Sequence, residues 1–141
     1  MILLDTNVIS EPLRPVPAAP VSHWLDAQPL ETLFLSVITV AELRAGVAMM
    51  PAGKRKDVLG IHLENSILPM FAGRILPFDL VCTNAYAKLM VKVRNAGSGI
   101  QTADALIAAV AFANGFSVAT RDENPFCAAG LHVINPWKFH E

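Results

Sequence analysis

The first seven residues, Met1-Ile2-Leu3-Leu4-Asp5-Thr6-Asn7, constrain the fold more than any other part of the chain. Their apolar start predicts a short strand that is buried on both faces, as in the middle of a parallel sheet. An unpaired carboxylate is costly inside such a core, so Asp5 must meet water, a partner or a cation where the strand ends. Ligands of open α/β sheets bind at the carboxyl ends of the strands. We therefore predict that Asp5 forms one wall of a functional site.

The remainder of the chain alternates between strand-like and helical segments. Further strands are predicted at residues 33–36, 74–78, 117–120 and 132–135, and helices at 8–11, 23–28, 38–50, from 54 onward, 80–96 and 102–114. Prolines at four positions within residues 12–20 predict an extended or turn-rich connection there. Few hairpin signals interrupt the alternation. It predicts one domain over residues 1–141, an α/β fold that is a three-layer α/β/α sandwich with a mostly parallel central sheet.

Composition excludes several classes of protein. A hydrophobic content of 53% with only 16% charged residues indicates that both faces of the sheet are covered. The longest uncharged run, residues 105–120, is too short to span a membrane and is interrupted by Asn114-Gly115. Asp5 breaks the apolar start too early for a signal peptide, so we expect a soluble, cytoplasmic protein. A net charge of −1 argues against a strongly basic nucleic-acid binder, unless a cation neutralises acids that share one pocket.

Cysteine and histidine usage argues against a soft-metal site. Cys82 and Cys127 lack CxxC spacing, so both are predicted to be reduced thiols. The four histidines are scattered along the chain and form no HExxH-like pattern. We therefore do not expect zinc.

Among the twelve acidic residues, four fall where an α/β fold gathers functional groups. Asp5 ends the first strand, and Asp122 follows the strand at 117–120. Glu42 lies in the helix at 38–50, on a face of small and apolar residues, so we expect its side chain to point into packed structure. Asp104 lies in the first turn of the helix at 102–114, also on an apolar face. All four are expected near the carboxyl ends of the strands.

Each acid also has a purely structural interpretation. The helix dipole and capping favour an Asp in a first helical turn, which would explain Asp104. Asp122 fits a turn, and Glu42 fits an ion pair with Arg44 or another base. Taken together, carboxylates that face one point repel each other unless their pKa values rise or a cation joins them. Oxygen ligands select hard ions such as Mg²⁺ or Mn²⁺, and a hard ion held by carboxylates suits phosphodiester hydrolysis.

Five motifs, in this order along the chain, resemble those of PIN-domain ribonucleases, and within that family the VapC-type toxins of bacterial toxin–antitoxin operons. They are Leu4-Asp5-Thr6-Asn7, Thr39-Val40-Ala41-Glu42-Leu43-Arg44-Ala45-Gly46, Asp104-Ala105-Leu106-Ile107-Ala108-Ala109, Thr120-Arg121-Asp122 and Ile134-Asn135-Pro136-Trp137. Each motif alone is weakly specific, but the ordered set covers essentially the whole chain.

The resemblance implies a PIN-like fold, a pocket for Mg²⁺ or Mn²⁺, endonucleolytic cleavage of RNA, a homodimer and a cognate antitoxin. By position, Asp5, Glu42 and Asp104 match the family's three central acids. Thr6 and Thr120 match hydroxyl positions near the pocket, and Asp122 falls where relatives carry Asn or Asp.

One position departs from the family pattern. Relatives often have a further Asp just before the Phe of the following loop, and Pro125 occupies that place before Phe126. Asp122 then supplies the fourth carboxylate, or the site has fewer ligands, and we expect one firmly held ion rather than two. Arg44 is expected at the pocket rim, where it reaches a substrate phosphate or an antitoxin carboxylate. The other basic residues are interpreted as solvated charges.

Two other functions compete with a toxin nuclease. A non-catalytic PIN-like module would bind RNA or protein, but the chain keeps at least three pocket acids, which argues against it. A receiver-type phosphoacceptor domain would need adjacent acids after the first strand and a lysine after a late one. The first strand ends instead in Asp5 alone, and the late strand leads to Arg121-Asp122. The RNA target, the oligomer beyond a dimer and the antitoxin's identity stay open at this point.

Overall fold

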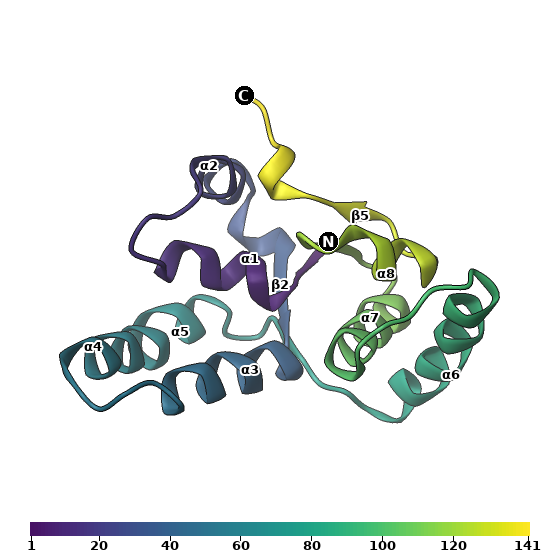
Figure 1. Ribbon diagram of the computed structural model, residues 1–141, viewed down its shortest axis with the longest axis horizontal. Coiled ribbons are helices and arrows are strands. Elements are labelled where there is room, and N and C mark those ends of the chain that lie inside the picture. The colour runs from purple at the N-terminus through teal and green to yellow at the C-terminus, as the bar shows by residue number, and fades with distance from the viewer.

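The five strands of the central sheet are short and all parallel, in the order β3-β2-β1-β4-β5 (Figure 1). The computed structural model describes residues 1–141. The strands are β1 (Ile2–Leu4), β2 (Leu33–Ser36), β3 (Ile75–Leu76), β4 (Ser117–Ala119) and β5 (Val133–Ile134). The helices are α1 (Thr6–Ser10), α2 (Ala19–Ala27), α3 (Val37–Ala48), α4 (Lys54–His62), α5 (Leu68–Met70), α6 (Leu80–Asn95), α7 (Thr102–Asn114) and α8 (Glu123–Ala128), with turns η1 (Glu11–Leu13), η2 (Leu30–Thr32), η3 (Leu63–Ile67) and η4 (Pro136–Lys138).

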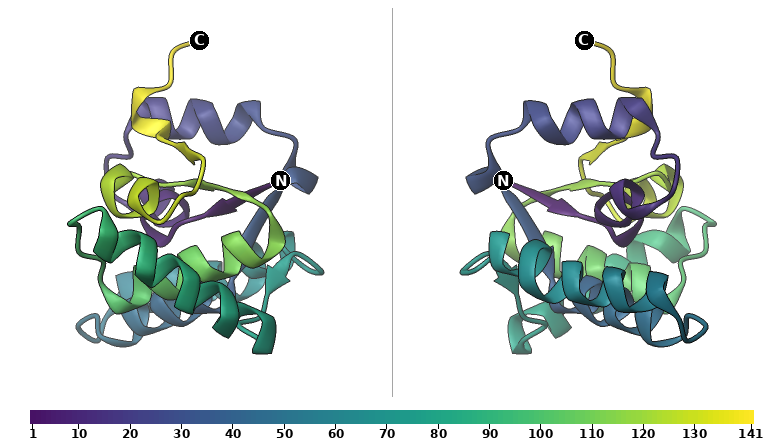
Figure 2. Two further views of the ribbon diagram at one scale, coloured as in Figure 1. Left: turned by 90° about the vertical axis from the view of Figure 1, so that its right-hand side faces the viewer. Right: turned by 90° about the vertical axis from the view of Figure 1, so that its left-hand side faces the viewer.

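The predicted three-layer sandwich is confirmed by how the central strand is buried. Leu3 and Leu4 are both fully buried but belong to different core clusters, because successive side chains of a strand point to opposite faces. Val118 and Ala119 of β4 divide between the same two clusters. One cluster packs the sheet against α6, α7 and α8, and the other against α1, α2, α3 and η3. Figure 2 shows these helical layers from either side.

Strand order fixes where a site can form. The chain builds β2 and then β3 on one side of β1, and later places β4 and β5 on the other side. The strand order therefore reverses between β1 and β4, which is the point where open α/β sheets bind their ligands. Both strands have their carboxyl ends at that edge, since they pair in parallel with Leu4 opposite Ala119.

Some predicted elements differ from those observed. The segment from 12 to 20 is not extended throughout, because η1 includes Pro12 and α2 already begins at Ala19, with Pro20 in its first turn, where the missing N–H costs nothing. The helix predicted from Lys54 onward changes into the π-helical turn η3. Helix α8 was not predicted. The left-handed Gly115 (φ +69°) ends α7 as expected.

None of the helices has both the length and the apolar content that crossing a membrane requires.

Candidate active site

Asp5 lies at the switch point, where β1 and β4 end side by side. Its carboxylate is only 3% exposed. Oδ1 accepts a hydrogen bond of 2.8 Å from the backbone N–H of Thr6 and so caps α1, and Oδ2 accepts one of 2.8 Å from the Thr120 hydroxyl. Asp5 and Thr120, which lie 115 residues apart in the sequence, are therefore brought together by the pairing of the two strands.

Glu42 reaches the same edge from α3. The Thr6 hydroxyl donates a 2.6 Å hydrogen bond to Glu42 Oε1 and lies 3.2 Å from the Thr39 hydroxyl. Ser36 caps α3 by accepting from the Thr39 N–H at 3.2 Å, which sets the first turn of this helix. Thr6 thus connects the turn that follows β1 to the Glu42 carboxylate.

The expected burial of Glu42 in packed structure was wrong. Glu42 is exposed, together with Ala45, Gly46 and Met49 on the same face of α3. The helix turns Val40 and Leu43 into the core instead. Small residues on a helix face thus did not indicate packing here.

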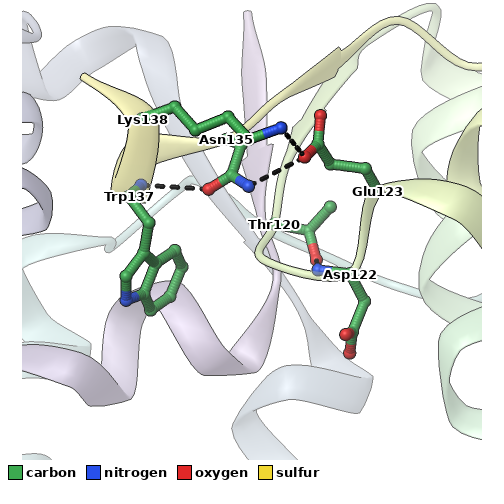
Figure 3. Close-up of polar contacts among 6 residues, drawn as sticks. All are labelled: Thr120, Asp122, Glu123, Asn135, Trp137 and Lys138. Atoms are coloured by element: carbon green, nitrogen blue, oxygen red, sulfur yellow. Dashed lines mark hydrogen bonds and ion pairs between the residues drawn. The ribbon is translucent and has the colours of Figure 1, made fainter. Parts of the chain in front are cut away.

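Asp104 and Asp122 face a shared hollow of about 710 Å³. Asp104 is half-buried in the first turn of α7, and Asp122 is exposed in the turn before α8. The Asp122 N–H donates to the Thr120 hydroxyl oxygen at 3.0 Å, so one threonine contacts both Asp5 and the Asp122 turn. Figure 3 shows the Asp122 carboxylate pointing away from the neighbouring Glu123 side chain.

Electrostatic coupling links the four acids. Burial raises the pKa of Asp5 to about 6; hydrogen bonds from Thr120 and Thr6 oppose this rise, and the charges of Asp104 and Glu42 add to it. The pKa of Asp104 is raised by burial first, and then by Asp122 and Glu42. Asp104 is therefore the acid that is coupled to all three others, at the centre of an anionic region.

The donor chemistry of this region fits a hard divalent cation, since its ligands are carboxylate oxygens whose mutual repulsion a cation would relieve. However, no group of three acidic, histidine or cysteine side chains is arranged to hold one ion directly. Glu42 is held by Thr6, and Asp5 is engaged by Thr6 and Thr120. The acids are thus neighbours, but they are not a closed ligand cage.

Arg44 does not lie at the pocket rim. Its guanidinium forms a two-pronged ion pair with Glu64 of η3, at 2.8 and 3.0 Å. Arg44 also lines a separate groove with Val37 and Leu68. The expected contact with a substrate phosphate is therefore not supported, because a carboxylate of the protein already occupies the guanidinium.

One group of contacts at this edge of the sheet was not predicted from the sequence. Glu123 accepts a 2.9 Å hydrogen bond from Asn135 Nδ2 and forms a 2.6 Å ion pair with Lys138, both of which lower its pKa (Figure 3). Asn135 Oδ1 in turn accepts from the Trp137 N–H at 3.0 Å. We call Glu123, Asn135 and Lys138 the C-terminal clasp. Asn135-Pro136-Trp137 was noted as a motif, but its spacing from Glu123 carried no local signal.

Carboxylates gathered at the switch point of an entirely parallel sheet place the chain in the class of α/β proteins with an acidic site at that edge. Residues 2–130 match the PIN domain, and the chain belongs to the PIN-domain family. The resemblance noted in the motifs is thereby confirmed.

Named relatives match over nearly their whole length. The chain is 67% identical over 138 residues to the plasmid stability protein StbB of Pseudomonas syringae pv. tomato, covering 98% of this chain and 99% of that protein. It is 56% identical to the VapC ribonuclease Y4jK of Sinorhizobium fredii, with the same shares covered. It is also 56% identical to Toxin FitB of Neisseria gonorrhoeae, covering 97% and 99%. The crystal structure of FitAcB from that organism has a TM-score of 0.95, with 55% identity over 99% of this chain and 100% of that one.

Proposed function

We propose that the protein is a PIN-domain toxin of a toxin–antitoxin pair that hydrolyses RNA phosphodiester bonds as a divalent-metal-dependent endoribonuclease. The observation that carries this proposal is the arrangement of the acids at the switch point of the sheet. Thr120 hydrogen-bonds to Asp5 and the Asp122 turn, Thr6 hydrogen-bonds to Glu42, and Asp104 shares a hollow with Asp122. The names of the relatives, a VapC ribonuclease and a toxin, support the same reaction and the same biological role.

Asp5, Glu42, Asp104 and Asp122 would hold Mg²⁺ or Mn²⁺ partly through bound water, since no three of them are arranged to ligate one ion directly. When bound, such an ion lowers the pKa of a water molecule and neutralises charge on the phosphate. Two threonines set the positions of the acids. Thr120 orients Asp5 and the Asp122 turn, and Thr6 orients Glu42. Asp104 is half-buried and lines the hollow, so it would contact the ion on the side that is open to substrate.

Metal dependence is tested by cleavage and by stability together. We expect purified protein to cleave RNA in Mg²⁺ or Mn²⁺ and to be inactive in excess EDTA. An ion that binds only the folded state should also add about 2.7 kcal/mol to the free energy of unfolding at a hundredfold excess over its Kd. Calorimetry with Mn²⁺, with Ca²⁺ for comparison and EDTA as baseline, measures this gain. Equal cleavage with and without EDTA would exclude the metal mechanism.

A non-catalytic PIN-like module that binds RNA or protein is the second candidate, and the retained acids argue against it. In that case RNA would bind without being cut in any of these ions. The cleavage assay therefore separates the two functions.

For partners we propose a second copy of the chain and a cognate antitoxin, acting in the cytoplasm where RNA is available. Large apolar side chains stay exposed just after α3 and on α4 and α6, among them Met49, Ile61 and Leu80, and association would cover such surface. Light scattering at micromolar concentration is expected to give the mass of a dimer. A monomer under all metal conditions would contradict the dimer. Co-purification with a neighbouring gene's product tests the antitoxin, and loss of RNA cleavage in that complex is the expected result.

A further inference from the structure

Arg121 is a basic residue beside the acids to which neither the fold nor the metal site gives a role. It lies in the turn between β4 and α8, next to Asp122, and it is exposed. Its backbone N–H donates to Asn7 Oδ1 at 3.4 Å, which ties this turn to the start of α1. Its guanidinium carbon lies 5.2 Å from the centre of the Trp137 ring, within the range of a cation–π contact.

The surroundings of Arg121 are acidic, yet its charge is not neutralised by any side chain of the protein. Three carboxylates, Asp104, Asp122 and Glu123, line the same hollow, and Arg121 is the one base among the lining residues. The ion pairs of the protein do not include Arg121. Glu123 is the next acid along the chain after Asp122 that could pair with Arg121, but it is already engaged by Lys138 and Asn135. The guanidinium is thus free to bind an anion from outside.

The C-terminal clasp and Trp137 hold this guanidinium in place. Asn135 contacts both Glu123 and the Trp137 N–H, so the segment that carries the indole is fixed to the residue that follows Asp122 (Figure 3). The residues on either side of Asp122 therefore contact one C-terminal segment, Arg121 through Trp137 and Glu123 through the clasp. A guanidinium held on an aromatic face loses less side-chain freedom when it binds a ligand.

We propose that Arg121, supported by Trp137, binds a phosphate of the RNA strand beside the acidic site. The proposal rests on the proposed function and adds a substrate-binding residue to it. The planar guanidinium of an arginine can donate two parallel hydrogen bonds to phosphate oxygens. The acids alone would repel the RNA backbone. The Arg121 guanidinium at the rim of the hollow offsets that repulsion and sets where the RNA strand crosses the site.

The test compares RNA binding by variants in an Asp104→Asn background, where cleavage should not interfere. A fluorescein-labelled single-stranded RNA oligomer is titrated in Mg²⁺ by fluorescence anisotropy at several salt concentrations. Arg121→Gln should weaken binding about tenfold, the size of one lost charge-assisted contact. The slope of log K against log salt should fall in magnitude by about 0.7, as for one phosphate contact to a single strand. Arg121→Lys should recover part of both effects.

Two further variants separate the role of Arg121 from general charge effects. Trp137→Leu should weaken binding about two- to fivefold and leave the salt slope nearly unchanged, because the guanidinium remains but loses its support. Arg55→Gln is the matched control, since Arg55 is an exposed arginine on α4 that does not line the hollow, and it should change neither quantity. In cleaving protein, Arg121→Gln should raise KM more than it lowers kcat. Melting temperatures of all variants report folding, and if Arg121→Gln is unstable, Arg121→Lys and Trp137→Leu carry the comparison.

Three results would overturn the inference. Arg121→Gln with the wild-type salt slope and Kd would show that the guanidinium does not meet a phosphate. A loss in kcat at constant KM would place its effect on the acids instead. Unchanged RNA binding with weakened binding of a protein inhibitor would assign Arg121 to a partner's carboxylate. If the wild-type protein neither cleaves nor binds RNA, it is the proposed function itself that fails.

Discussion

Asp104→Asn is expected to reduce RNA cleavage by at least about a hundredfold while the protein stays folded. Changing a residue that only supports a metal ligand typically costs about ten- to a hundredfold in activity. The loss expected here is larger because Asp104 itself faces the hollow. It is also the acid that is coupled to the other three. Initial rates on a labelled RNA measure the loss. Asp57→Asn, the same change at an exposed position on α4, is the control and should leave the rate unchanged.

The stability of the same variant distinguishes a functional carboxylate from a structural one. Removing one charge from the acidic region should make the metal-free Asp104→Asn protein at least as stable as wild type, because burial and two neighbouring acids raise the pKa of Asp104. Its gain on adding Mn²⁺ should be much smaller than that of wild type. A markedly less stable metal-free variant would identify Asp104 as a favourable first-turn residue of α7 instead.

In the absence of metal, the protein should lose about 3 kcal/mol of unfolding free energy through Asp5 as the pH rises from about 3 to 7. The pKa of this carboxyl is raised from 3.8 to about 6 in the folded state, chiefly by burial. Between these values the unfolded chain releases a proton that the folded protein keeps, so rising pH favours unfolding. At 1.36 kcal/mol per pKa unit, the shift gives about 3 kcal/mol, fully lost above pH 6.

Urea unfolding in EDTA across this pH range measures the effect, with Asp5→Asn as the reference because it lacks the titrating group. Acids away from the site titrate equally in both proteins, so the difference in unfolding free energy between them reports Asp5 and its coupling to Asp104 and Glu42. That difference should change by about 3 kcal/mol in favour of the variant as the pH rises. A difference that stays constant from about pH 3 to 7 would show that Asp5 ionises at its ordinary pKa and that its burial is not costly.

Elements whose cause is local were predictable from the sequence. Met1 to Leu4 reads as a doubly buried strand because each residue is apolar, and the structure puts Leu3 and Leu4 in opposite cores. The position of Asp5 follows from the end of that strand. Helix α7 was also predicted correctly, since its apolar residues are continuous and Gly115 ends it. In these cases the hydrophobic pattern of the element and the residue that ends the element lie close together in the sequence.

Features that depend on distant partners were not predictable. Arg44 was placed at the rim from its closeness to Glu42, but it pairs with Glu64 twenty residues later. The exposed position of Glu42 depends on which face of α3 packs on α1 and α4, and small residues do not specify that face. Helix α8 was not predicted, although a proline within the first helical turn is compatible with a helix and Phe126 anchors it.

The hydrogen bond between Thr120 and Asp5 joins residues 115 positions apart and has a consequence for synthesis in the cell. The central strand β1 emerges from the ribosome well before its neighbour β4, which is translated only after α7. Such a long-range pairing cannot form early, and it makes folding slower than a local contact would. An unfinished chain therefore carries Asp5 without Thr120, Asp122 or the clasp. The acidic site is therefore incomplete until β4 and the turn that leads into α8 have been synthesised.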